Sequence, residues 1–238
     1  DMTRSRGLGD VYKRQPLHQL ENKLPKTVKG LHIHTLCEQD FPPLARTVHA
    51  LHPFLEAVAS QLRWLNLGGG HLVTRHDYER AALAELTNEL AHTYDVQVFL
   101  ELGTAVAFDA GIMVGEVLDV MDNEGPVAVL DVSATCHMPD ILEAPYRPAL
   151  RDECLGGQAV RLGGPSCLAG DVIGTYGFDA LPQAGDRLAF LDQAHYSMVK
   201  TTTFNGVRLP ALAIWNSDTD ALRMVRTFDY ADFEGRLS

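Results

Sequence analysis

The chain has 238 residues, 46% of them hydrophobic, and a formal net charge of −11 at pH 7. A chain of this size can bury one large core or two smaller ones. The acidic balance argues against a nucleic-acid partner, since phosphate contacts need clustered Lys and Arg. The sequence contains neither a run of about 18 apolar residues nor a secretory signal, so we expect no membrane association and a cytoplasmic location.

The N-terminal half alternates between strand and helix patterns. We exclude residues 1–15 from the fold as a non-native or disordered leader, because they show no apolar period. Strands are predicted in VKGLHIHTL, RWLNLGGG and DVQVFLELG. Helices are predicted between them, in residues 43–62 and 74–94, with Thr74 and Asp77 in a capping-box arrangement at the second. This order predicts a parallel sheet with helical crossovers.

After about Ala110 the pattern changes. Short apolar runs, such as PVAVLDVSA and RLAFLDQA, are separated by Gly, Pro, Asn and Asp turns. This spacing is typical of strands joined by turns. We therefore predict a second, all-β domain over residues 111–238.

Three glycines end the second predicted strand. Backbone amides at Gly68, Gly69 and Gly70 can approach an anion without a side chain between, and the following helix offers its positive end. A tight strand-to-helix turn explains the glycines equally well. Glu101 ends the third strand, where an apolar setting requires a positive or hydrogen-bonding partner for the carboxylate, such as a pyridinium nitrogen.

Histidines at the strand ends raise the alternative of a metal site. His32 and His34 lie two apart and project on one face, with Cys37 just beyond and His71 on the neighbouring strand end. No carboxylate or second cysteine falls at a spacing that completes tetrahedral ligation, so we expect no metal. A packed core histidine is the alternative for either histidine alone.

Longer runs carry a resemblance to a known family. They are GLHIHTLCEQ, WLNLGGGH, LDVSATCHMPDILEAPYRP, LGGPSCLAGDVIG and HYSMVKTTTFNGVRLP. Through them the sequence resembles the fold type III, alanine-racemase-like decarboxylases that use pyridoxal 5'-phosphate, and among these the carboxynorspermidine/carboxyspermidine decarboxylases. The resemblance implies an α/β plus β chain: a partial (β/α)8 TIM-like barrel in residues 16–110 and an all-β sandwich or barrel in residues 111–238.

The resemblance also implies which residues bind the cofactor. His34 would stack on the pyridine ring, and Glu101 would pair with the ring nitrogen. The phosphate would be held by backbone amides of the glycine turn and by the Tyr196 hydroxyl. The full cofactor-binding set is His34, Gly68, Gly69, Gly70, Glu101, Gly103 and Tyr196.

A polyamine substrate and a homodimer with shared active sites are implied as well. Cys167 would come from the partner subunit and help protonate the carbanion. Asp131, Asp140 and Asp171 would bind ammonium groups, and Arg147 the substrate carboxylate.

Each of these roles has an alternative. Asp140 and Arg147 could join Glu143 in a surface ion-pair group. Cys167 could be a small buried apolar residue, and Asp171 could shape a turn.

Two departures from the family pattern stand out. The family's cofactor-binding lysine has no counterpart, since the context of Lys13, Lys23, Lys26, Lys29 and Lys200 does not match, so we expect this chain alone to be a catalytically silent fragment. The third strand end reads ELGTA, in which Leu102 and Thr104 replace a proline and a glutamate. Thr104 would weaken the binding of a substrate amine, because a hydroxyl carries no charge.

The predicted reaction is the decarboxylation of carboxynorspermidine or carboxyspermidine to norspermidine or spermidine. A diaminopimelate or diamine decarboxylase is the alternative within the enzyme class. A non-catalytic regulatory paralogue is the alternative outside it, although the retained Gly, His and Glu residues argue against loss of the site.

Overall fold

A computed structural model describes residues 23–237, and their contacts divide the chain into two units between Phe108 and Asp109. The leader expected over residues 1–15 lies outside the described residues. Within residues 23–237, no helix combines the length and apolar character that crossing a bilayer requires.

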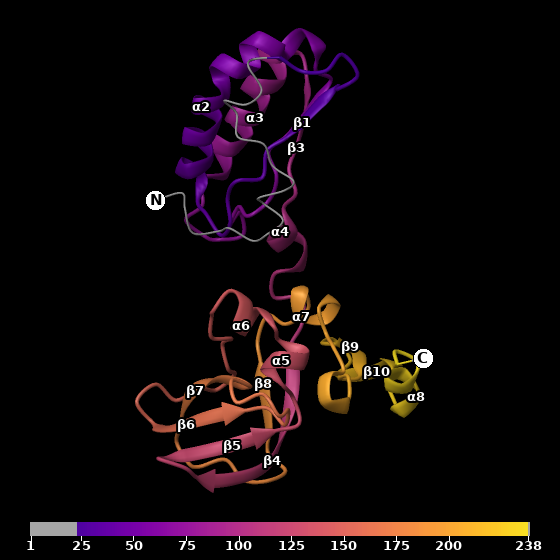
Figure 1. Cartoon of the computed structure of the whole chain (residues 1–238). Helices are drawn as coiled ribbons and strands as arrows, with labels where there is room; N and C mark the ends of the chain where they lie inside the picture. The colour runs from indigo at the N-terminus through magenta and orange to yellow at the C-terminus, as the bar shows by residue number, and fades with distance from the viewer. Residues whose placement is uncertain (1–22, 238) are drawn as a thin grey trace. The chain divides into compact units, whose positions relative to one another are not determined.

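The N-terminal unit contains a parallel three-stranded sheet in the order β1 (Gly30–His32), β2 (Trp64–Asn66) and β3 (Gln97–Phe99). Helix α2 (Phe41–Val58), extended by η2 (Ala59–Gln61), connects β1 to β2, and helix α3 (Arg80–Tyr94) connects β2 to β3. Figure 1 shows α2 and α3 side by side. The predicted parallel sheet with helical crossovers is confirmed for these three strands.

One core holds this unit together. The apolar residues at helical spacing in the sequence of α2 are Leu44, Val48, Leu51, Leu55 and Val58. All are buried except Leu51, which is partly buried. They pack with Leu65 of β2 and Leu90 of α3. The 3.6-residue period therefore identified the buried face of α2 correctly.

The start of the second helix was predicted too early. Helix α3 begins at Arg80, and its N-cap residue Glu79 makes no side-chain cap. Arg75 Nη2 instead binds the Asp77 carboxylate at 2.8 Å, and Arg80 donates to the carbonyl of Val73 at 2.8 Å. These arginine contacts stabilise a turn where the capping box of Thr74 and Asp77 was expected.

The C-terminal unit is built on a five-stranded sheet in the order β7-β6-β5-β4-β8. Only β5 and β6 run parallel; the other neighbours are antiparallel. The bounds are β4 Met113–Asp122, β5 Pro126–Leu130, β6 Gln158–Gly163, β7 Val172–Phe178 and β8 Arg187–Phe190. Side chains such as Leu130, Val160 and Phe190 are fully buried in its core.

Short helices accompany this sheet. They are α5 (Ala134–His137), α6 (Asp140–Glu143), α7 (Tyr196–Val199), η3 (Phe204–Gly206) and α8 (Tyr230–Glu234). The expectation of an all-β domain was therefore too narrow: the unit is a mixed sheet with helical segments. A separate antiparallel hairpin, β9 (Leu212–Asn216) and β10 (Ala221–Arg226), exposes Ile214, Trp215, Leu222 and Met224.

The strand directions bring several loops to one edge of the five-stranded sheet. Parallel β5 and β6 end at the same edge, where β7 begins. Because β4 is antiparallel to both β5 and β8, β8 also ends there. Figure 1 shows α5, α6 and α7 grouped on one side of the sheet.

Candidate functional site

In the N-terminal unit, the candidate residues follow the carboxyl ends of three adjacent parallel strands. Backbone hydrogen bonds continue past the strands: Ile33 N–H donates to Asn66 O at 2.8 Å, and Glu101 N–H donates to Gly68 O at 2.8 Å. The three loops are thereby held in register. Such an edge is where parallel α/β sheets place their ligands.

The glycine turn fits closely against its neighbours. A Cβ at Gly69 would lie 2.4 Å from the carbonyl oxygen of Glu101, and one at Gly70 would lie 2.3 Å from that of Leu36. Gly70 also has a φ of +78°. Both positions therefore require glycine for packing, which supports the tight-turn explanation without opposing an anion site.

The amides of this turn have partners within the chain. Gly68 N–H donates to Asn66 Oδ1 at 2.8 Å, and Gly69 N–H donates to His34 Nδ1 at 3.2 Å. A phosphate bound at Gly69 would replace the imidazole as acceptor.

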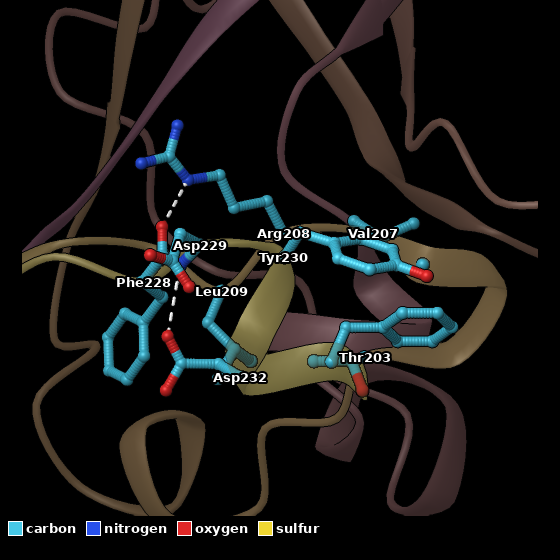
Figure 2. A pocket seen from close by; sticks show the side chains of 10 residues that line it. Thr203, Val207, Arg208, Leu209, Phe228, Asp229, Tyr230 and Asp232 are labelled. Carbon is cyan, nitrogen blue, oxygen red and sulfur yellow. Dashed lines mark hydrogen bonds between the residues drawn. The ribbon is translucent and has the colours of Figure 1, made fainter. Parts of the chain in front are cut away.

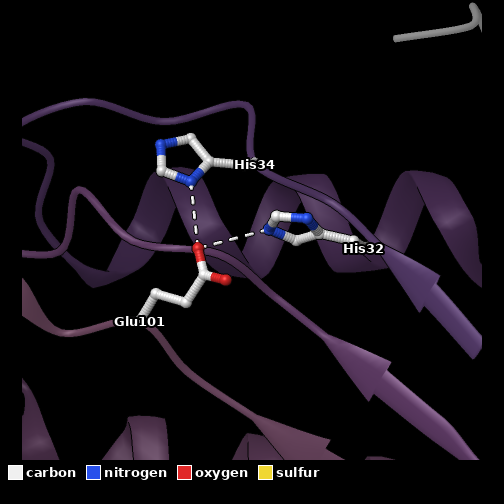
Figure 3. Close-up of side chains that lie close together, drawn as sticks. All are labelled: His32, His34 and Glu101. Carbon is white, nitrogen blue, oxygen red and sulfur yellow. Dashed lines mark ion pairs between the residues drawn. The ribbon is translucent and has the colours of Figure 1, made fainter. Parts of the chain in front are cut away.

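The Glu101 carboxylate faces the imidazoles of His32 and His34 (Figure 3). Its Oε2 is 3.3 Å from His32 Nε2 and 3.5 Å from His34 Nδ1, and its Oε1 accepts a hydrogen bond from Asn66 Nδ2 at 3.0 Å. The Asn66 bond, and next the charge of His32, hold the pKa of Glu101 below its ordinary value. The carboxylate is half-exposed and ionised, so it can meet a positive ligand group.

His71 and Thr104 belong to the packing beneath this cluster. His71 is 1% exposed, and burial lowers its pKa. Thr104 Oγ1 donates to the His71 carbonyl at 3.3 Å. His71 is thus a buried histidine, whereas the side chains of His32 and His34, for which a packed core position was the alternative, are 48% and 35% exposed. Gly103 begins α4 (Gly103–Ala107) with open space around its Cβ position.

In the C-terminal unit, Asp171 is surrounded by protein donors. It is 4% exposed and accepts hydrogen bonds from Ser133 Oγ at 2.9 Å, Thr135 N at 3.0 Å and Ser166 N at 3.1 Å. Burial would raise its pKa, but the bonds from Ser166, Thr135 and Ser133 outweigh burial and hold the pKa below its ordinary value. These contacts favour a role in holding two loops together over the expected contact with a polyamine ammonium.

Cys167 lies on one of those loops and is exposed. Its backbone N–H donates to Asn205 Oδ1 at 2.8 Å. The alternative that Cys167 is a small buried apolar residue is therefore wrong, because its thiol is exposed.

The acidic candidates have partners of their own. Lys200 Nζ pairs with both Asp140 and Glu143, and these two carboxylates raise the pKa of Lys200. Asp131 Oδ1 accepts from Glu116 N at 2.7 Å. Two carboxylates and one ammonium thus form a compact ion-pair group beside α7.

Arg147 is not part of that group. Its guanidinium binds the Glu153 carboxylate at 3.0 Å and lies over the ring of Tyr176, 4.4 Å from the centroid. Burial raises the pKa of Tyr176 to about 12, so the ring beneath the guanidinium stays neutral. The alternative ion-pair group of Asp140, Glu143 and Arg147 is therefore wrong for Arg147. The cation that pairs with Asp140 and Glu143 is Lys200.

Tyr196 begins α7 and is 64% exposed, and its backbone N–H donates to His195 Nδ1 at 2.9 Å. It belongs to the C-terminal unit, whereas His34, Glu101 and the glycine turn belong to the N-terminal unit.

Four contributors were missed from the sequence: Asn66, Ser133, Lys200 and Asn205. Lys200 had a usable signal, because it lies one helical turn after Tyr196. The others act through hydrogen bonds between distant segments, which spacing along the chain does not reveal.

A separate hollow of about 330 Å³ lies near the C-terminus (Figure 2). Arg208 Nε donates to the Phe228 carbonyl at 2.6 Å at its border, and Tyr230 and Phe233 of α8 contribute rings. Its lining contains none of the predicted site residues.

Known proteins match most of the chain. The family described as pyridoxal-dependent decarboxylase, C-terminal sheet domain, matches residues 11–194. A carboxyaminopropylagmatine decarboxylase from Synechocystis sp. is 42% identical over 226 residues, which are 92% of this chain and 57% of that protein. A carboxynorspermidine/carboxyspermidine decarboxylase from Campylobacter jejuni is 38% identical over 230 residues, which are 91% of this chain and 60% of that protein.

A solved structure agrees with these matches. The carboxynorspermidine decarboxylase from Campylobacter jejuni, complexed with norspermidine, is 36% identical with a TM-score of 0.83, covering 92% of this chain and 63% of that one. The chain spans 57–60% of the length of the curated relatives described above. The chain belongs to the pyridoxal-dependent decarboxylase family.

Proposed function

We propose that this chain contributes to a pyridoxal 5'-phosphate-dependent decarboxylase that removes a carboxyl group from a carboxylated polyamine. Carboxynorspermidine and carboxyspermidine are the preferred substrates, with norspermidine and spermidine as products. The observation that carries the proposal is the ionised Glu101 beside His34 and the glycine turn, at the shared edge of three parallel strands.

The three strands fit one part of a larger α/β barrel. Two consecutive strand–helix–strand crossovers in a parallel sheet are the repeating unit of such barrels. The relatives named above are longer than this chain. We propose that a barrel start carrying the cofactor-binding lysine, and a second copy of the chain supplying Cys167, complete the site.

The described residues fit the cofactor. Glu101 Oε2, which faces His32 and His34, can also accept a hydrogen bond from a protonated ring nitrogen, while Asn66 fixes its Oε1. The His34 ring, whose side chain is 35% exposed, can stack on an aromatic face. When bound, the cofactor supplies the electron sink for the electrons left by CO2. Gly69 N–H would hold its phosphate, and the Cys167 thiol of the second copy would hold a proton for the product carbon.

Binding of the cofactor should depend on Glu101. We expect Glu101→Gln to weaken binding of pyridoxal 5'-phosphate by about 10-fold or more, because a hydrogen bond to an ion is replaced by one to a neutral amide. Equilibrium dialysis against the 238-residue chain measures this. His92→Ala is the control, since its imidazole binds the Asn88 carbonyl on the outer face of α3. Equal affinity of Glu101→Gln and the native chain would contradict the proposed pairing.

Substrate choice needs a complete enzyme. A protein that contains this sequence together with a lysine-bearing barrel start should release CO2 from carboxynorspermidine or carboxyspermidine. Carboxyaminopropylagmatine is the necessary comparison, because the Synechocystis relative is named for it. Turnover of diaminopimelate in preference to all three would contradict the polyamine assignment.

Lys200 is expected to limit polyamine binding. Its ammonium group forms ion pairs with the carboxylates of Asp140 and Glu143, so a substrate ammonium group must compete for the same oxygens. We expect Lys200→Met to tighten norspermidine binding several-fold, in line with the modest strength of exposed ion pairs. Calorimetric titration measures this, with the exposed Lys29→Met as a matched control. Unchanged or weaker binding would show that Asp140 does not bind the polyamine.

A further inference from the structure

The cluster of His32, His34 and Glu101 also has the donor set of a transition-metal site. Each side chain offers one ligand atom, and the three atoms lie within 4.8 Å of one another. Zn²⁺ binds nitrogen and oxygen ligands at about 2.0–2.2 Å, which places neighbouring donors of a tetrahedral site about 3.3 Å apart. Glu101 Oε2 is 3.3 Å from His32 Nε2 and 3.5 Å from His34 Nδ1. Two of the three donor separations therefore already suit the ion.

The third separation, between the two imidazole nitrogens, can close by side-chain rotation. The side chains of His32, His34 and Glu101 are 48%, 35% and 46% exposed, so each has room to move. The same exposure leaves a fourth position open to water or another ligand.

A hydrogen bond at His34 leaves one imidazole nitrogen of the cluster unprotonated, as a metal ligand must be. Gly69 N–H donates to His34 Nδ1, so this nitrogen carries a lone pair in the structure. Asn66 Nδ2 holds Glu101 Oε1 and leaves Oε2 directed toward the histidines. Hydrogen bonds of this kind orient ligating carboxylates. An ion at His34 Nδ1 would replace the Gly69 contact.

Glu101 is the member of this cluster that the spacing of residues along the sequence did not predict. It follows β3, whereas the two histidines come from the end of β1, with β2 between them. The side chains meet across the glycine turn that follows β2, where a Cβ at Gly69 would lie 3.5 Å from His34 Cε1. A turn without side chains thus lets ligands from the two outer strands approach each other.

We propose that this cluster binds one divalent transition-metal ion, for which Zn²⁺ is the best match to two imidazoles and a carboxylate. We further propose that the ion and pyridoxal 5'-phosphate exclude each other, because both require His34 and Glu101. The exclusion rests on the proposed function; the metal binding does not.

Metal binding is tested on the 238-residue chain by calorimetric titration with Zn²⁺. We expect one ion at this cluster, with Glu101→Gln and His32→Ala each weakening its affinity more than 10-fold, and His92→Ala leaving it unchanged. Circular dichroism confirms that the variants fold. A Co²⁺ absorption spectrum should show nitrogen and oxygen ligation without a thiolate band. A thiolate band, or native affinity in both cluster variants, would overturn the site.

The exclusion is tested by dialysis with pyridoxal 5'-phosphate in the presence and absence of one equivalent of Zn²⁺. We expect the ion to weaken cofactor binding and a chelator to restore it. Simultaneous binding of both would overturn the exclusion. If the chain binds Zn²⁺ with the expected variant pattern but does not bind the cofactor, the metal site stands and the proposed function fails.

Discussion

Replacing Asp171 by alanine is expected to destabilise the C-terminal unit by about 3–5 kcal/mol. The substitution leaves the donors of Ser133, Thr135 and Ser166 without their acceptor in a buried setting. Each unsatisfied donor costs about 1–3 kcal/mol, and partial relaxation keeps the total below their sum. Urea denaturation, combined with hydrogen exchange of peptides from β5 and β6, measures the loss.

The same carboxylate should make stability depend on pH. The pKa of Asp171 is lowered in the folded chain, so its contribution is present above the unfolded pKa and is lost as pH falls through the folded pKa. Asp171→Asn keeps the shape of the side chain but should remove this acid dependence. Destabilisation of less than about 1 kcal/mol in Asp171→Ala would refute the bridging role.

Gly70→Ala is expected to destabilise the N-terminal unit by about 3 kcal/mol. A side chain at a φ of +78° costs about 1–2 kcal/mol, and a Cβ 2.3 Å from the Leu36 carbonyl oxygen forces the backbone to move. Thermal unfolding of the native and variant chains measures the difference.

Gly103→Ala provides the matched control for this prediction. Nothing lies within 4 Å of its Cβ position, and it begins a short helix. We expect no loss of stability there, and a gain of up to about 1 kcal/mol, because alanine favours helix over glycine. Similar effects at Gly70 and Gly103 would show that the glycine turn does not depend on close packing.

The sequence predicted the arrangement of the N-terminal unit because its periodicity changes clearly between strand and helix. Parallel strands place their carboxyl ends together, so the sequence alone predicts that His34, Gly69 and Glu101 lie at one edge of the sheet. The start of α3 was misplaced because Thr74 and Asp77 have the residue types of a capping box, while contacts of Arg75 and Arg80 decide the local structure.

The chemistry of the C-terminal unit was harder to predict. Asp171 resembles any acidic turn residue in the sequence. Ser166 lies in the same loop, but Ser133 and Thr135 come from the segment after β5, which only the sheet topology brings beside it. The alternative ion-pair group placed Arg147 beside Asp140 because it is nearer along the chain, whereas the cation there is Lys200, just after α7. Spacing reveals neighbours within one element, but not partners that meet across loops.

The β9–β10 ribbon has a practical consequence for handling this chain. Ile214 and Trp215 are successive residues, so their exposed side chains point to opposite sides of the ribbon. A two-stranded ribbon with exposed apolar side chains on both faces can associate with identical ribbons of other molecules. We expect the chain to aggregate through this ribbon at high concentration. A charged residue at position 215 should delay the rise in turbidity that reports aggregation.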